Sequence, residues 1–154
     1  MKSVFLCLGL AILITLPSPA GADDPVRVVD GDGLKVGAVS IRLWGIDAPE
    51  LDQTCEQDGR TVTCGEEARF LLGALVMAGD LVCETKGNDR YRRIIAQCSA
   101  GGHDLAGEMV RQGYALDWPK YSKGFYAVQQ AEARENERGL WAGEFIKPWD
   151  WRRR

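Results

Sequence analysis

The stretch from Val28 to Glu50 constrains the fold more than any other part of this 154-residue chain, because its short strand-like runs end in charged turns. In the run Ile41-Arg42-Leu43, strand alternation sends the two aliphatic side chains to one face and the guanidinium to the other. Glycines and a proline mark the turns. These turns place three carboxylates at strand exits near Arg42: Asp32, Asp47 and Glu50. Catalytic residues commonly stand at such exits, on a rigid scaffold but open to solvent.

Carboxylates grouped in this way favour a hard divalent cation, which binds oxygen ligands. Asp32 and Asp47 are the candidate ligands, together with a nearby backbone carbonyl. Arg42 would then face the anion held by the cation, and the charged hairpin tip at residues 88–93 would bring a second guanidinium to it. This combination suits a phosphodiester attacked by water, because guanidinium groups match phosphate oxygens and the cation neutralises charge in the transition state.

Three segments, in this order, resemble the active-site segments of the staphylococcal nuclease (thermonuclease) family. They are Asp30-Gly-Asp32, Arg42-Leu-x-x-x-Asp47-x-Pro49-Glu50 and Asp89-Arg-Tyr91-x-Arg93. Later features resemble the family too: residues 109–115, the helix with Glu132-Ala133-Arg134, and Gly139-Leu140-Trp141. The similarity spans roughly residues 26 to 141.

The resemblance implies an α+β fold, a five-stranded OB-fold barrel with three helices packed around it, whereas periodicity alone gives only α+β. We expect strands near residues 26–30, 34–36, 39–46, 81–86 and 92–98. The first helix would follow a capping box formed by Thr63 and Glu66 and end near Gly79. It would bury Ala68, Leu71, Leu72 and Leu75. A second helix would start at Asp104, and a third would run from Ser122 to Gly139 with Val128, Ala131 and Leu140 facing inward.

Carried over to this chain, the family's site implies that Asp32, Asp47 and the carbonyl oxygen of Ala48 bind calcium. Glu50 would orient or deprotonate the attacking water. Arg42 and Arg93 would hold the phosphate and stabilise its transition state. Tyr91 is a candidate for contact with the nucleotide, and Tyr121 for lining the pocket. The substrate would be single-stranded or flexible DNA or RNA, and we expect a monomer.

The sequence departs from the family pattern beside these residues. Gly33 replaces the usual threonine after Asp-Gly-Asp, and Ala48 replaces a frequent threonine. Arg92 stands where glycine usually precedes the active-site arginine, and glycine commonly serves a positive φ. Asp30 is expected to shape its turn. An alternative for the charged residues is a structural ion-pair network between Asp32, Asp47 and the two arginines.

Residues 1–22 have the pattern of a secretory signal peptide. Lys2 precedes an apolar run from Val4 to Leu16, which is too short to span a bilayer, and Ala20-Gly21-Ala22 offers a cleavage site. The mature chain would be a single domain, residues 23–154, located outside the cytoplasm in the periplasm or medium and not in a membrane. The alternative is an uncleaved anchor.

Four cysteines remain after the leader is removed, an even number that predicts disulfides in an exported protein. Cys83 and Cys98 fall on two strand-like runs around a turn, and Cys55 and Cys64 bracket a polar loop, so we predict these two pairs. A zinc site is the alternative, but the chain has no Cys-x-x-Cys pair and only His103 besides.

Charge and the C-terminal residues 145–154 leave the strength of nucleic-acid binding open. The mature chain has 18 basic and 22 acidic residues, a net charge of −4, so binding would depend on local basic residues and be sensitive to salt. The tail contains two tryptophans and ends in three arginines. These would either pack the tryptophans and leave the arginines solvated, or stack on bases and bind phosphates.

The sequence thus predicts an exported, calcium-dependent nuclease. Two alternatives are a catalytically weak OB-fold module that binds nucleic acid or another anionic polymer, and a serine hydrolase. The latter lacks a Gly-x-Ser-x-Gly motif and has only His103 to act as base.

Overall fold

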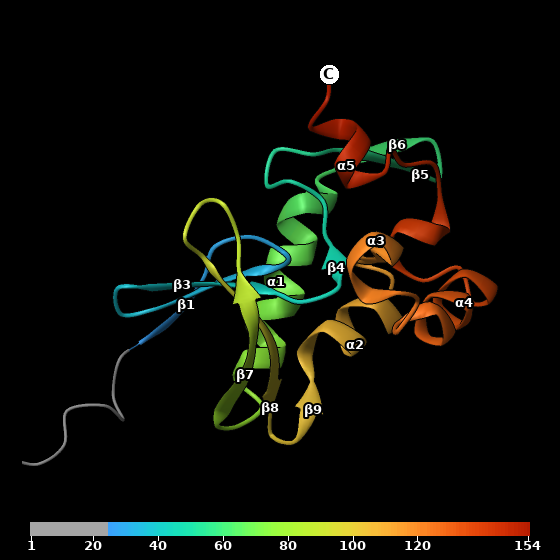
Figure 1. Ribbon diagram of the computed structural model, residues 1–154. Helices are drawn as coiled ribbons and strands as arrows, with labels where there is room; N and C mark the ends of the chain where they lie inside the picture. The colour runs from blue at the N-terminus through green and yellow to red at the C-terminus, as the bar shows by residue number, and fades with distance from the viewer. Residues whose placement is uncertain (1–24) are drawn as a thin grey trace, which may run out of the picture.

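The computed structural model describes residues 25–154, so the predicted signal peptide lies outside the described residues. A strongly curved sheet forms one half of the molecule, and helices pack against its concave side and one end (Figure 1). Its strand order is β1-β2-β3-β8-β7, with β9 added to β8. The strands are β1 Val26–Val28, β2 Gly33–Val36, β3 Val39–Leu43, β7 Leu81–Asn88, β8 Ile94–Ala100 and β9 His103–Asp104.

Only β3 and β8 pair in parallel; the other neighbours in this sheet are antiparallel. The five longer strands form a half-barrel, and the two edge strands β1 and β7 do not pair with each other in the described chain. The predicted α+β OB-fold is therefore confirmed, although the barrel is not fully closed by hydrogen bonds.

The strand predicted at 39–46 is interrupted, and this break positions Asp47. Trp44 still donates its N–H to the carbonyl of Ala96, but Gly45 has φ 80° and turns the chain away from the sheet. Strand β4 (Ile46–Asp47) then pairs antiparallel with β10 (Leu116–Asp117). The carboxylate of Asp47 thus stands beside the sheet, where another segment reaches it.

Helix α1 (Cys64–Val76) packs its predicted face on the core: Ala68 and Leu72 are fully buried, and Leu71 and Leu75 are partly buried. The predicted capping box is wrong, because Thr63 makes no side-chain cap. Glu66 instead pairs with Arg69 one turn later, at 2.5 Å.

Helix α2 (Leu105–Arg111) begins as predicted, with Asp104 accepting a hydrogen bond from the N–H of Ala106. Helix α4 (Ala127–Glu135) is shorter than predicted and turned differently: Val128 is 77% exposed and Ala131 is exposed too. The reason is Tyr126, which is fully buried and donates its hydroxyl to Asp104, so the next residues face outward. Short helical segments complete the chain: α3 Pro119–Ser122, η1 Gly139–Ala142 and α5 Pro148–Trp151.

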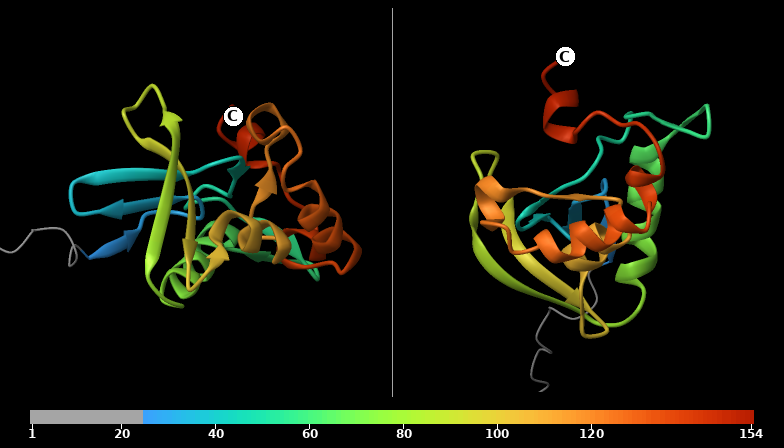
Figure 2. Two further views of the ribbon diagram at one scale, coloured as in Figure 1. Left: turned by 60° about the horizontal axis from the view of Figure 1, so that its bottom comes forward. Right: turned by 90° about the vertical axis from the view of Figure 1, so that its right-hand side faces the viewer.

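Both predicted disulfides are present, Cys55–Cys64 and Cys83–Cys98. The polar loop after Glu50 contains a small hairpin of β5 (Cys55–Gln57) and β6 (Arg60–Val62). Its disulfide belongs to a second buried cluster with Leu116 and Leu140, onto which aromatic side chains of the C-terminal segment pack. The segment that leads into α5 (Figure 2) lies against this loop although the two are far apart in sequence: Glu144 bridges to Glu56, and Ile146 accepts a hydrogen bond from Gln53.

No helix between residues 25 and 154 has the length and apolar character needed to cross a membrane.

Candidate active site

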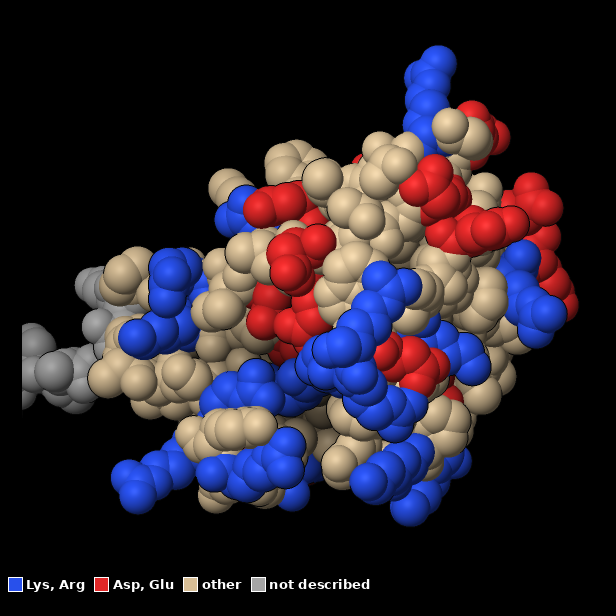
Figure 3. All heavy atoms as spheres, turned by 90° about the horizontal axis from the view of Figure 1, so that it is seen from above, with Lys and Arg blue, Asp and Glu red and all other residues tan. Residues whose placement is uncertain are grey.

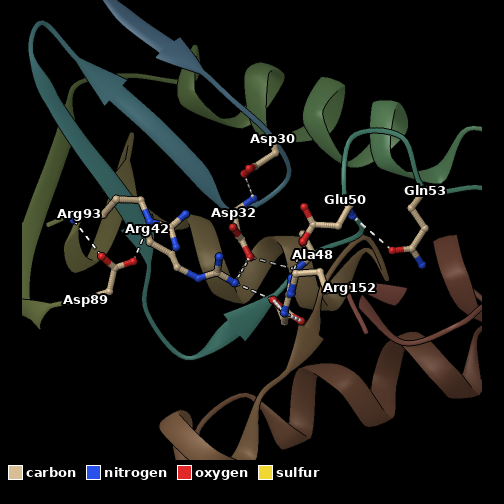
Figure 4. A network of polar contacts seen from close by, with 10 residues as sticks. Asp30, Asp32, Arg42, Ala48, Glu50, Gln53, Asp89, Arg93 and Arg152 are labelled. Atoms are coloured by element: carbon tan, nitrogen blue, oxygen red, sulfur yellow. Dashed lines mark hydrogen bonds and ion pairs between the residues drawn. The ribbon is translucent and has the colours of Figure 1, made fainter. Parts of the chain in front are cut away.

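One cavity of about 820 Å³ is lined by predicted site residues from five segments of the chain, and by Arg152 from a sixth. Asp32 comes from the β1–β2 turn, Arg42 from β3, Glu50 from the loop after β4, Arg93 from the β7–β8 turn and Arg152 from the end of α5 (Figure 4). Asp47 does not line the cavity; it is fully buried behind Arg42, which donates to it at 2.6 Å. The structure therefore brings all the predicted site residues to one place, and adds Arg152 to them.

The turn that carries Asp32 is shaped by Asp30, as predicted. The Oδ1 of Asp30 accepts a hydrogen bond of 3.2 Å from the N–H of Asp32. A Cβ at Gly33 would lie 2.6 Å from that same oxygen. Glycine at position 33 therefore makes room for Asp30 over the turn, which accounts for the departure from threonine.

Arg42 joins the two buried carboxylates through a single nitrogen. Its Nη2 donates to Asp32 Oδ2 at 2.8 Å and to Asp47 Oδ1 at 2.6 Å. The N–H of Ala48 also donates to Asp32 Oδ2, at 3.2 Å. Burial raises the pKa of Asp32 to about 7, although Arg42 acts in the opposite direction. Burial also raises the pKa of Asp47, against the effect of its arginine partners.

Glu50 stands on a loop that is held from both sides. Its N–H donates to the side-chain carbonyl of Gln53, and the amide of Gln53 donates to the carbonyl of Ile146 at 2.6 Å. Gln53 is fully buried. On the other side, α1 approaches so closely that a Cβ at Gly65 would lie 1.8 Å from the carbonyl oxygen of Glu50.

The β7–β8 turn presents Arg93 through Asp89. The carboxylate of Asp89 accepts hydrogen bonds from the N–H of Tyr91, the N–H of Arg93 and the Nε of Arg93, the last at 2.7 Å. Arg93 therefore pairs with Asp89 and not with Asp32 or Asp47. Arg92 has φ 65°, the positive value for which glycine is commonly used. Arg90 and Arg92 are exposed.

Tyr91 and Tyr121 both line the cavity and keep large exposed surfaces, 66% and 48%. The guanidinium of Arg93 lies 5.8 Å from the ring of Tyr91. The ring of Tyr121 packs edge-on against Trp118, with centroids 4.6 Å apart. Both rings are thus available to a flat group such as a nucleobase.

Arg152 corrects the prediction that the three terminal arginines are either solvated or free to bind phosphate. Its Nη2 donates to Asp47 Oδ1 and Oδ2 at 2.9 and 2.7 Å, and its Nη1 donates to Glu50 Oε1 at 2.5 Å. Although burial alone would lower the pKa of Arg152, these carboxylates raise it. The two tryptophans of the tail make different contacts. Trp149 stacks on Trp118 with ring centroids 5.9 Å apart, whereas the ring of Trp151 packs against the guanidinium of Arg154.

The surface around the cavity is more basic than the chain as a whole. Figure 3 shows Lys and Arg side chains gathered beside a group of acidic ones on this side of the molecule. Basic residues that line the cavity are Arg42, Lys86, Arg90, Arg93, Lys120 and Arg152. An anion that enters the cavity therefore meets positive charge on several sides.

Comparison with known families decides how this arrangement is classified. The sequence model of the family described as staphylococcal nuclease homologue matches residues 40–143, more than half of the chain. The chain belongs to the staphylococcal nuclease family. Membership fits the OB-fold and the order of the three segments that carry the acidic and basic residues.

Relatives in the staphylococcal nuclease family cover most of the chain. An Escherichia coli protein named as an uncharacterized endonuclease is 36% identical over 136 residues, which is 84% of this chain and 83% of that protein. The succinoglycan biosynthesis protein ExoI of Rhizobium meliloti is 34% identical over 87% of this chain and 73% of its own length. The probable staphylococcal-like nuclease CAN4 of Oryza sativa is 30% identical over 73% of this chain and 21% of its own length.

Gln53, Trp118 and Arg152 were missed by sequence reasoning because no local motif marks them. Arg152 lies 105 residues from Asp47 and beyond the segment that matches the family. The only signal for it was in the tail itself, where two tryptophans stand directly before three arginines. Asp89 was part of a recognised motif, but its role as the partner of Arg93 was not predicted.

Proposed function

We propose that this member of the staphylococcal nuclease family is an exported, calcium-dependent nuclease that hydrolyses phosphodiester bonds of DNA, RNA or both. The observation that carries the proposal is the convergence of Asp32, Asp47, Glu50, Arg42 and Arg93 on one cavity. The relatives named as endonucleases and staphylococcal-like nucleases support the nuclease function.

The proposed ligands are oxygen atoms, the ligand type that calcium prefers. Asp32 and Asp47 are buried carboxylates that both lie within hydrogen-bond reach of one nitrogen, so their oxygens face a common point that favours positive charge. Within residues 25–154, no three His, Cys, Asp or Glu side chains gather closely enough to bind a metal ion alone. Backbone oxygen, for which we propose Ala48, together with water and substrate phosphate would complete the six to eight ligands that calcium takes.

Calcium bound by Asp32 and Asp47 would supply positive charge to the phosphate and lower the pKa of a nearby water. Glu50 would accept the proton of the attacking water as its oxygen bonds to phosphorus and the bond to the leaving oxygen breaks. Arg42 and Arg93 would donate to the non-bridging oxygens, where charge gathers in the transition state, each contributing about 2–4 kcal/mol.

The substrate, we propose, is single-stranded or flexible nucleic acid. Tyr91 and Tyr121, which both line the cavity, would contact unpaired bases, and each stacked base contributes about 1–3 kcal/mol in single-strand binding. A stiff duplex would have to distort for a base to reach either ring, whereas a single strand bends freely.

Export rests on the predicted signal peptide, residues 1–22, and is consistent with the two disulfides. The mature protein would be one domain, residues 23–154, that acts as a monomer in the periplasm or medium.

A second function is favoured by one observation, the hydrogen bonds from Arg152 to both Asp47 and Glu50. If that guanidinium were never displaced, the cavity would bind anionic polymers without cutting them. The chain would then be a catalytically weak or inactive OB-fold module.

Digestion of single-stranded DNA and RNA by the mature, oxidised protein distinguishes the calcium-dependent nuclease from the inactive binding module. We expect cleavage at low salt with calcium, none with chelator, and a loss of at least about a hundredfold in Glu50→Gln. Glu135→Gln, an exposed change on α4 away from the cavity, is the matched control and should cut normally. Binding without cleavage by the folded wild-type protein would favour the module; calcium-independent cleavage would refute the proposed cation.

A further inference from the structure

Arg152 occupies the atoms that a divalent cation would need. One of its terminal nitrogens contacts both oxygens of Asp47, and the other contacts Glu50. A cation that ligates Asp47 uses the same lone pairs. Arg152 and the cation therefore compete for Asp47, and their positive charges repel each other at this range.

The position of Arg152 is fixed by the whole C-terminal segment. Glu144 forms a backbone bridge with Glu56, and Ile146 accepts the hydrogen bond from Gln53. Trp149 then stacks nearly parallel to Trp118, at an interplanar angle of 15°. This segment delivers α5, with Arg152 at its end, to the carboxylates.

Trp118 links Arg152 to Arg42, the proposed phosphate-binding arginine. The guanidinium carbons of Arg42 and Arg152 lie 5.9 and 5.7 Å from the Trp118 ring, so one aromatic side chain contacts both cations. Asp47 likewise accepts from both guanidinium groups. Arg152 is thus built into the site as closely as Arg42 is.

We propose that Arg152 is a positioning residue of the active site. It holds the carboxylate of Glu50 beside Asp47 and competes with the divalent cation for Asp47. Its effect on cleavage rests on the proposed nuclease function, whereas its effect on cation binding does not. The two effects have opposite signs: without Arg152 the cation binds more tightly, and Glu50 is less well placed to accept a proton.

Calcium titration by calorimetry, without nucleic acid, tests the competition. We expect Arg152→Gln of the mature, oxidised protein to bind calcium about tenfold more tightly than wild type. Arg153→Gln is the control, because it removes the same charge from the next residue, which pairs with Asp150 instead. Equal or weaker calcium binding by Arg152→Gln, or no calcium binding by either protein, would overturn the proposal.

Steady-state cleavage at saturating calcium tests the positioning. We expect kcat to fall about tenfold in Arg152→Gln, with partial recovery in Arg152→Lys, which keeps the charge but not the fork of two nitrogens. Structural damage would instead weaken calcium binding and cleavage together, and an unchanged kcat would refute the positioning. If the wild-type protein cuts no nucleic acid, the proposed function fails, while the calcium comparison still decides whether Arg152 competes with the cation.

Discussion

Arg92 adopts a backbone conformation that most side chains avoid, one residue before the arginine that faces the cavity. Its φ of 65° lies in the left-handed region, which costs an L-residue about 1 kcal/mol. The hydrogen bonds of Asp89 to Tyr91 and Arg93 hold the turn in this shape. The strained backbone of Arg92 therefore does not displace Arg93, but it lowers the stability of the folded protein.

Arg92→Gly should raise the free energy of unfolding by about 0.5–1 kcal/mol, because glycine adopts positive φ without strain. Urea denaturation measures this change in the free energy of unfolding. Arg90→Gly is the matched control: Arg90 is an exposed arginine in the same turn without positive φ, and its replacement should lower stability by a similar amount. Equal losses in both variants would show that the turn does not strain Arg92.

Local motifs predicted single residues well and distant partners poorly. Asp32 and Asp47 lie only 10 and 5 residues from Arg42 in the sequence, so their convergence with Arg42 followed from strand alternation and the turns between the strands. The partner of Arg152 depends on how the last helix packs, through Trp149 and Gln53, which no short-range pattern encodes. The reason for glycine at position 33 was not predicted, because the approach of Asp30 to this position exists only in the folded turn.

The start of α1 and the loop that carries Glu50 form one tightly packed unit. The N–H of Gly65 donates to the carbonyl of Gln53, and the backbone of Glu50 passes within contact distance of the Gly65 Cα. The start of α1 therefore fixes the position of the Glu50 backbone at the cavity.

Gly65→Ala should lower the free energy of unfolding by about 2 kcal/mol or more and reduce cleavage at least tenfold, because its Cβ would collide with the Glu50 backbone. Thermal unfolding and a cleavage assay on the same samples measure both. Gly73→Ala lies in the same helix with open space around its Cβ, and should gain about 0.5–1 kcal/mol without change in rate. Normal cleavage by a folded Gly65→Ala protein would contradict this account.

Elements with strong periodicity were predicted, and short ones were not. Helix α1 follows from its aliphatic spacing, and the β7–β8 hairpin from its alternation and paired cysteines. Strands β4 and β10 have two residues each, so only the positive φ of Gly45 and their mutual pairing define them. Helix α4 was placed with the wrong face inward because Tyr126, just before its start, decides its rotation.

At the scale of the whole molecule, a net negative chain presents a basic cavity. Six lysines and arginines line the cavity against four carboxylates, and Figure 3 shows basic and acidic side chains side by side on this face of the molecule. Binding of a polyanion therefore depends on a few local contacts, and more distant acidic residues repel it when salt is low.

Single-strand affinity, measured with Glu50→Gln in calcium, should fall with salt at a log–log slope of about −2 to −3, as expected for three or four phosphate contacts. Lys120→Gln, at the cavity border, should make the slope shallower by about 0.7. Arg60→Gln, an exposed change on β6 outside the cavity lining, should leave it unaltered. Equal effects of the two substitutions would mean that overall charge governs binding.

The bond between Cys55 and Cys64 has a consequence for where such a protein is able to work. It closes the loop that follows Glu50 and lies in the buried cluster onto which the C-terminal segment packs. Thiols in the cytoplasm stay reduced, and there the loop is held only by non-covalent contacts. If the protein is exported as proposed, the loop beside the proposed catalytic base would reach its full rigidity only after oxidation, away from the nucleic acid of the cell that makes it.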